Sequence, residues 1–194
     1  MNGMIFLLFI YAAFTVNIVL QCALGIKGVV ESKSPINIVT YIKAGIIFFT
    51  IILLWFFFSK VLLSIASGLF IYILLFPVSA IIYDALEYII FNFLVKKDAK
   101  SDSIINFPGG ITAVAVFICI NITGSIFFTI VLSLGFVSGI FLINLIIREI
   151  RRRAALEAVP VFLRGKPLVL VSMGLISLVF TTASLLLFRM IGNG

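Results

Sequence analysis

Long runs of apolar residues, separated by short polar segments, make up most of this chain. Each run has about 20 residues, which as an α-helix rising about 1.5 Å per residue matches the ~30 Å hydrocarbon layer of a bilayer. The pattern therefore predicts an all-α membrane protein that forms a single integral domain over residues 1–194. We expect six transmembrane helices, at 4–26, 36–58, 61–82, 104–122, 126–147 and 168–188.

A basic segment at 148–167, REIRRRAALEAVPVFLRGKP, separates the last two runs and is expected to be a loop at one membrane face. The segments 27–35 and 96–103 also carry lysines. Because short loops rich in Lys and Arg stay in the cytoplasm, the loops after the first, third and fifth spans are expected there. The opposite side has only Lys60 and Arg189. This distribution predicts a multi-pass protein of the cell (inner) membrane with both termini outside.

The composition agrees with a membrane location. Hydrophobic residues make up 63% of the chain and charged residues 11%, against about 45–50% and about 25% in soluble domains. Two cysteines and no histidine exclude a disulfide framework and argue against a zinc site made by this chain alone. The net charge of +7 lies in the loops, which favours cytoplasmic anchoring over nucleic-acid binding. The glycine and nucleophile motifs of soluble enzymes are absent from the sequence.

The polar segment 96–103 divides the chain into two halves, about 1–95 and 104–194, with three expected spans each. An odd number of spans per half means that a repeated unit would lie inverted in the membrane, as in many carriers. The sequences FTVNI at 14–18 and FICINI at 117–122 look alike. Either common descent or chance explains this similarity.

Ionisable residues inside apolar runs are costly, so they are the first candidates for function. Asp84 and Glu87 are spaced i, i+3 and share one face of a helix. They either coordinate a translocated cation or relay protons, or they lie at the cytoplasmic boundary and pair with Lys96, Lys97 or the basic segment. Lys43 is close enough to the start of its span to extend toward the headgroups.

Other polar features in the apolar runs allow two interpretations each. Asn17 and Gln21, at i and i+4, either line an ion path or bond a neighbouring helix. The PGG sequence at 108–110 either unwinds a helix beside a buried site or marks a junction between loop and helix. Cys22 and Cys119 are either two ligands of an iron–sulfur cluster completed by a partner, or small buried apolar residues.

Several stretches resemble one family of membrane subunits. The matching sequences are AVP at 158–160, RG at 164–165, GLISLVF at 174–180, VNIVL at 16–20 and LGI at 24–26. The family has A-D-V-P, F-R/K-G, A-G-L-M-S-L-A-F and V-N-N-F-V-L…L-G-L-C at these places, and Glu87 stands at its Q-F-x-E-M glutamate. The chain thus resembles the Rnf A / Nqr E family, six-span subunits of the Rnf and Na⁺-pumping NADH:quinone reductase (Nqr) complexes.

The resemblance implies a fold of two inverted three-helix repeats that pairs with a paralogous six-span subunit. It also implies flavin-bearing partner subunits, translocation of Na⁺ or H⁺, and a [2Fe–2S] cluster shared with the paralogue. Lys27 and Val114 stand where the family has its cluster cysteines, whereas Cys22 and Cys119 each lie five residues away, about 7.5 Å of helix. The resemblance therefore leaves two possibilities, a cluster held by the shifted cysteines or a divergent subunit without one.

The expected function is that of a subunit without a catalytic centre of its own, which contributes scaffold and part of the ion or electron path to a redox-driven pump. The alternative is a small inverted-repeat transporter or substrate-binding membrane subunit that lost the redox role.

Overall fold

The structure is a computed structural model that describes residues 2–22, 38–62, 70–95, 108–156, 160, 163 and 165–192. Within these residues the chain is helical apart from short turns, and it contains no strand. The first half has α1 (Asn2–Ile10), η1 (Tyr11–Thr15), α2 (Ile18–Gln21), α4 (Ile38–Phe57), η2 (Phe58–Leu62), α6 (Phe70–Ile90) and η3 (Phe91–Val95), where η marks a π-helix. The second half has α7 (Pro108–Ile122), α8 (Ile126–Leu156) and α9 (Lys166–Gly192).

Four segments are long and apolar enough to cross a bilayer, as judged by length and composition. They are Val39–Lys60, Ile73–Phe93, Ile126–Ala154 and Lys166–Ala183. The described parts of the first and fourth expected spans, Ile5–Gln21 and Pro108–Ile122, are apolar but shorter. The all-α fold is therefore confirmed, and four of the six expected spans have the length that a membrane helix needs.

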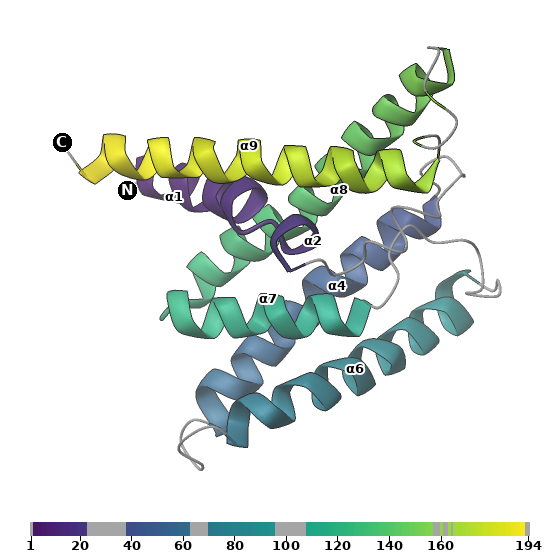
Figure 1. The fold of residues 1–194 in the computed structure, drawn as a ribbon. Helices are drawn as coiled ribbons and strands as arrows, with labels where there is room; N and C mark the ends of the chain where they lie inside the picture. Colours follow the sequence, from purple (N-terminus) through teal and green to yellow (C-terminus); the bar gives the residue numbers. More distant parts are fainter. Residues whose placement is uncertain are drawn as a thin grey trace.

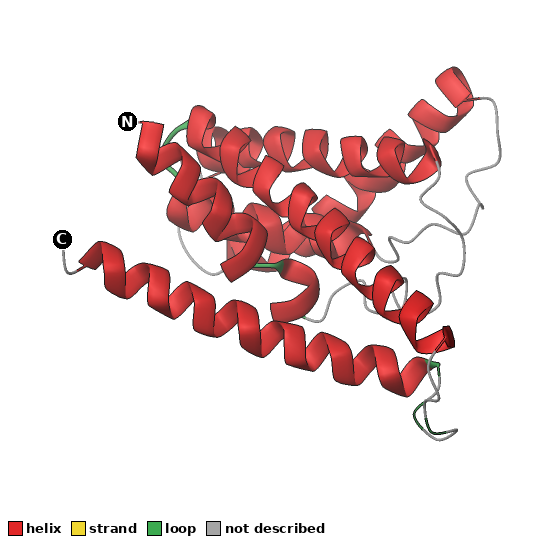
Figure 2. Ribbon diagram, turned by 90° about the horizontal axis from the view of Figure 1, so that it is seen from above, coloured by secondary structure: helices red, strands yellow, loops and turns green. Residues whose placement is uncertain are grey.

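Helix α4 lies at the centre of the bundle, where it contacts α6, α7 and α8 (Figure 1). Its buried residues fall on one broad face: Thr40, Lys43, Ala44, Ile46, Ile47, Thr50, Ile51, Leu54 and Trp55. Helices α6 and α9 lie at the outside, and α9 runs along one edge when the molecule is seen from above (Figure 2). Both outer helices expose large apolar side chains, among them Ile73, Ile81, Leu175 and Leu178.

Helices of the two halves run in opposite directions in three pairs (Figure 1). The α1–α2 segment runs opposite to α7, α4 runs opposite to α8, and α6 runs opposite to α9. The contacts correspond as well. The contact of α4 with α7 corresponds to the contacts of α8 with α1 and η1. The contact of α6 with α7 corresponds to the contacts of α9 with η1 and α2. The α4–α6 contact likewise has its counterpart in α8–α9.

Two glycines of α8 allow the N-terminal segment to approach closely. A Cβ at Gly135 would lie 2.9 Å from the Phe9 carbonyl oxygen and 2.5 Å from the Ala12 Cβ, and one at Gly139 would lie 2.7 Å from the Ala13 carbonyl oxygen. The spacing i, i+4 puts both glycines on one face, as in the small-residue contacts of membrane helices. These glycines fix how η1 sits against α8.

Two expected boundaries are wrong. The basic segment 148–167 is not a loop from its start, because α8 continues as a helix through Leu156. Arg, Ala, Leu and Glu all favour helix, and Arg153 Nε lies 3.0 Å from Glu149 Oε1 one turn away. The boundary between the expected spans 36–58 and 61–82 is also misplaced, because η2 continues as a helix from Phe58 through Leu62, and the next described helix, α6, covers Phe70–Ile90.

Candidate functional site

The N-terminal apolar segment is interrupted at Asn17. The π-helix η1 ends at Thr15, Asn17 has an extended backbone with φ −65° and ψ 109°, and α2 begins at Ile18. The Asn17 Oδ1 accepts hydrogen bonds from the backbone N–H groups of Val19 and Leu20, at 3.2 and 3.4 Å. Its Nδ2 donates to the Ala13 carbonyl oxygen at 3.0 Å. The buried Asn17 side chain therefore satisfies backbone groups on both sides of the break.

The two amides of this segment have different surroundings. Asn17 is buried against Gly139 of α8, whereas Gln21 is exposed and its Nε2 donates to Thr181 Oγ1 of α9 at 3.1 Å. Gln21 therefore has one of the two roles expected from the sequence, a bond to a neighbouring helix. The i, i+4 spacing does not bring the two amides into a common site, because the Asn17 side chain bonds to backbone groups of its own segment, whereas the Gln21 side chain bonds to Thr181 of α9.

A buried ion pair joins α4 and α6. Lys43 Nζ lies 2.8 Å from Glu87 Oε1, and the two side chains are only 9% and 18% exposed. Lys43 sits in the second turn of the central helix α4, and Glu87 lies in the last turn of α6. A single charge in such apolar surroundings is strongly disfavoured, so each side chain gives the other the counter-charge that it needs. This pair is the strongest candidate for a functional site among the described residues.

The ion pair bears on two expectations. Lys43 does not extend toward the headgroups but is buried, at 7% exposure. Glu87 has Lys43 as its partner among the described residues, whereas Lys96 and Lys97 lie outside them. Helix α6 packs on α4, and Glu87 lies beside the second turn of α4.

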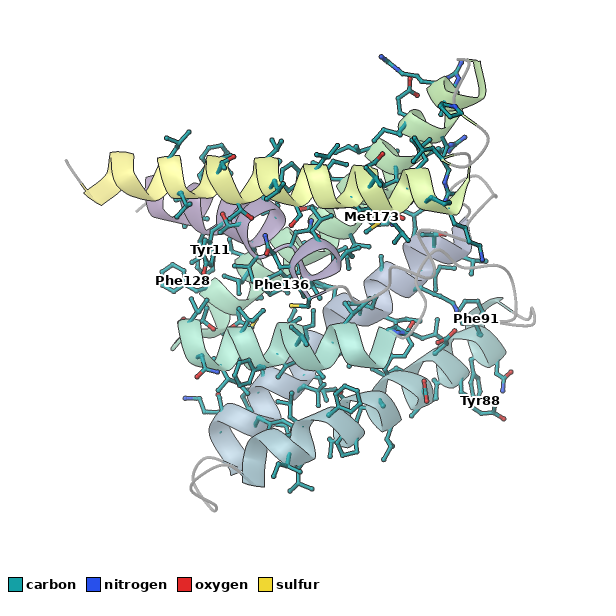
Figure 3. The ribbon with its side chains drawn as sticks, viewed as in Figure 1. Tyr11, Tyr88, Phe91, Phe128, Phe136 and Met173 are labelled. Carbon is teal, nitrogen blue, oxygen red and sulfur yellow. The ribbon has the colours of Figure 1, made fainter. Side chains whose placement is uncertain are left out.

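Two further residues of α6 lie close to Glu87 in sequence. Tyr83, one turn earlier, is fully buried, and its hydroxyl lies near the Glu87 carboxylate without a well-formed hydrogen bond to any described residue. Asp84 is exposed, and in the described part of the chain it forms no ion pair. Tyr88 also points away from the bundle, as Figure 3 shows. The expected pair of carboxylates is thus divided, with Glu87 inside and Asp84 outside.

The two cysteines expected to hold a cluster have different surroundings. Cys119 of α7 is fully buried within the apolar core, whereas Cys22, directly after α2, is exposed. Helix α2 does contact α7. Among the described residues no three His, Cys, Asp or Glu side chains gather as metal ligands. Val114 is half-buried against the core, and Lys27 lies outside the described residues.

The PGG sequence forms the first turn of α7 as the structure describes it. Pro108 is the first residue of α7, where its missing N–H costs nothing. Gly109 packs on α6, because a Cβ there would lie 2.9 Å from the Ala80 Cα. The Gly109 carbonyl oxygen accepts hydrogen bonds from Ser79 Oγ at 3.1 Å and Thr112 Oγ1 at 2.9 Å. This turn fixes α7 against α6 and does not expose backbone groups to a buried site.

Taken together, the fold and the site define an α-helical chain with several helices long and apolar enough for a membrane and with a buried Lys–Glu pair between two of them. A scan of family models finds no match to the chain, and a search of curated proteins finds none either.

Proposed function

We propose that this chain is a six-span membrane subunit of an Rnf/Nqr-type electron-transport complex that translocates Na⁺ or H⁺. In this proposal its two halves, about 1–95 and 104–194, are inverted three-helix repeats. The observation that carries it is the correspondence of helix contacts between the two halves. The contacts of α4 with α7, of α6 with α7 and of α4 with α6 each have a counterpart made by α8 or α9. The sequence stretches that resemble the Rnf A / Nqr E family add independent support.

The directions of the helices support the inverted arrangement. Each helix of the first half runs opposite to its counterpart in the second (Figure 1). The first and fourth spans also meet in the bundle, because α2 contacts α7. An inverted pair of three-helix units places its first helices together at a central axis, which is where carriers with this layout bind their ions.

The arrangement of helix ends supports the proposed topology. The end of α6, the start of α4, the end of α8 and the start of α9 lie toward one side of the bundle, opposite the start of α1 and the end of α9 (Figures 1 and 2). The basic segments 27–35, 96–103 and 148–167 adjoin these helix ends in the sequence. By the positive-inside rule this side faces the cytoplasm, and both termini lie outside the cell (inner) membrane.

Within such a complex the chain supplies scaffold and part of the ion path, and it has no catalytic centre of its own. Glu87 is the carboxylate on this path, and Lys43 holds it in an apolar bundle until a cation or proton takes the place of the ammonium group. Asp84, which is exposed and lies three residues earlier, serves as an outer carboxylate on the same helix. The partners are a paralogous six-span subunit, flavin-bearing subunits and lipid. Any [2Fe–2S] cluster of the complex rests on ligands other than Cys119.

The test is purification of the tagged chain in a mild detergent, with the partners identified by mass spectrometry. The proposal expects a second six-span subunit and flavin-bearing subunits in stoichiometric amounts. Iron analysis and EPR of the same complex in wild type and in a Cys22→Ser/Cys119→Ala variant then test the cluster separately, and an unchanged iron content is the expected result. A chain that purifies alone, or with partners that carry neither flavin nor iron, contradicts the proposal.

A second candidate function is an inverted-repeat transporter or substrate-binding membrane subunit. The specific observation in its favour is the Lys43–Glu87 pair itself, because a buried carboxylate with an exchangeable counter-charge needs no redox partner to couple to ion movement. Solute or cation uptake by proteoliposomes that contain this chain alone distinguishes it from the pump subunit, which is expected to be inactive without its partners.

A further inference from the structure

The part of α8 that extends beyond its apolar run carries a row of arginines. Helix α8 has 31 residues, Ile126–Leu156, so it is about 46 Å long at 1.5 Å per residue and exceeds the ~30 Å hydrocarbon layer by roughly ten residues. The apolar part ends at Ile147, and Arg148 begins the remainder. If the apolar part lies in the hydrocarbon layer, the last two turns of α8 therefore lie at the level of the lipid headgroups.

The arginines of these turns fall on two faces. Arg148, Arg151 and Arg152 are spaced i, i+3 and i+4 and share one face, which we call the arginine ridge. Arg148 and Arg152 are exposed, and Arg151 is half-buried at the edge of the ridge. Arg153 lies on a different face, where it pairs with Glu149 at 3.0 Å. The ridge itself includes no acidic residue, and like charges at this spacing repel one another.

The same face of α8 is apolar farther down the helix. Leu134 and Leu145 are exposed, at 47% and 54%, and they lie within about 60° of Arg148 and Arg152 around the helix axis at 100° per residue. Arg148 and Arg152 are about 6 Å apart along the axis, a separation that lets two guanidinium groups bind one phosphate from both sides. One face of α8 thus presents leucines for an acyl chain and, above them, arginines for a phosphate.

We propose that the arginine ridge of α8 is a binding site for an anionic phospholipid, whose phosphate lies between Arg148 and Arg152 and whose acyl chains lie along Leu145 and Leu134. The charge and the order of the residues along the face favour this occupant. A free phosphate would not contact the leucines, and a zwitterionic lipid has no net negative charge to attract the arginines. The proposal rests on the membrane insertion proposed above but not on the redox role.

The test compares two variants that each lose two positive charges. Arg148→Gln/Arg152→Gln removes the exposed part of the ridge. Arg153→Gln/Lys60→Gln is the matched control, because Arg153 lies on the other face of α8 and Lys60 lies in η2, which follows α4. Native mass spectrometry measures how much phosphatidylglycerol and phosphatidylcholine each detergent-solubilised protein retains. Circular dichroism and thermal melting check that both variants fold.

The expected result is a loss of phosphatidylglycerol affinity of about 30-fold in the ridge variant, from two arginine contributions near an anionic headgroup. The control and the wild type should bind it equally, phosphatidylcholine should bind weakly to all three, and excess inorganic phosphate should not displace the lipid.

Equal retention by both variants overturns the proposal and points to a protein partner for the ridge. Displacement by inorganic phosphate also overturns it, in favour of a soluble anion. A chain that stays soluble without detergent refutes the membrane insertion instead, so the two failures are distinguishable.

Discussion

Removing one partner of the buried Lys43–Glu87 pair is expected to destabilise the bundle strongly. Lys43→Met keeps the length of the side chain but leaves the Glu87 carboxylate, 18% exposed in its side chain, without its described counter-charge. Losing one member of a buried pair costs about 3–5 kcal/mol. Because both side chains retain some exposure, we expect a value near the lower end, about 3 kcal/mol.

The double variant separates the ion pair from the packing of its two side chains. Replacing both residues, in Lys43→Met/Glu87→Met, removes the charges together and is expected to lie within about 1 kcal/mol of wild type, because apolar residues often replace a buried ion pair without loss. The single variants are therefore expected to be non-additive by about 3 kcal/mol or more, which is typical of residues in direct contact. Asp84→Asn is the control, an exposed carboxyl on the same helix that should change stability by less than about 0.5 kcal/mol.

The assay is thermal unfolding of the four variants and the wild type in one detergent, followed by circular dichroism. For a chain of this length about 3 kcal/mol corresponds to a lowering of Tm by roughly 6–12 °C. A Tm of the Lys43→Met variant equal to that of Asp84→Asn would refute the reasoning. So would additive effects of the Lys43 and Glu87 substitutions, because the two side chains would then not interact.

Two further predictions concern the contacts of the N-terminal segment. Gly139→Ala should cost about 1–3 kcal/mol, because its Cβ would lie 2.7 Å from the Ala13 carbonyl oxygen, whereas Gly174→Ala, with nothing within 4 Å, should be neutral or stabilising. Equal melting temperatures for the two alanine variants would contradict the close contact of α8 with η1. Asn17→Ala should cost about 1–2 kcal/mol through the lost cap, while Asn121→Ala, exposed and bonded only to the Phe117 carbonyl oxygen among the described residues, should cost less than about 0.5 kcal/mol. If Asn121→Ala lowers the melting temperature as much as Asn17→Ala, the capping role of Asn17 is wrong.

The apolar pattern predicted the class of the fold because long apolar runs leave few other structures. The runs at 36–58, 126–147 and 168–188 correspond to α4, α8 and α9. The pattern misplaced helix ends, since a change from apolar to polar residues marks where a chain leaves lipid and not where its helix ends. The basic segment shows this directly, because its Arg, Ala and Glu residues favour helix and α8 continues through them to Leu156.

The candidate site was harder to predict, because its partners are distant in sequence. Glu87 is a rare ionisable residue in an apolar run, and this signal identified it, whereas Lys43 was expected to extend toward the headgroups. Whether they pair depends on the position of α6 along the length of α4. Apolar residues occur on all sides of α6, so the sequence pattern does not define that position. The break at Asn17 was also missed, because an asparagine in an apolar run is compatible with a helix–helix bond as well as with a cap.

The central claim, a six-span chain of two inverted halves, is tested most directly by its topology in the membrane. Paired reporters, one active only outside and one only in the cytoplasm, would be fused after Lys60, Lys100, Gly124, Pro160 and Gly194. The fusions at 60, 124 and 194 are expected to report the outside, and those at 100 and 160 the cytoplasm. A cytoplasmic signal at Gly194, or the same side for the fusions at 124 and 160, would contradict it.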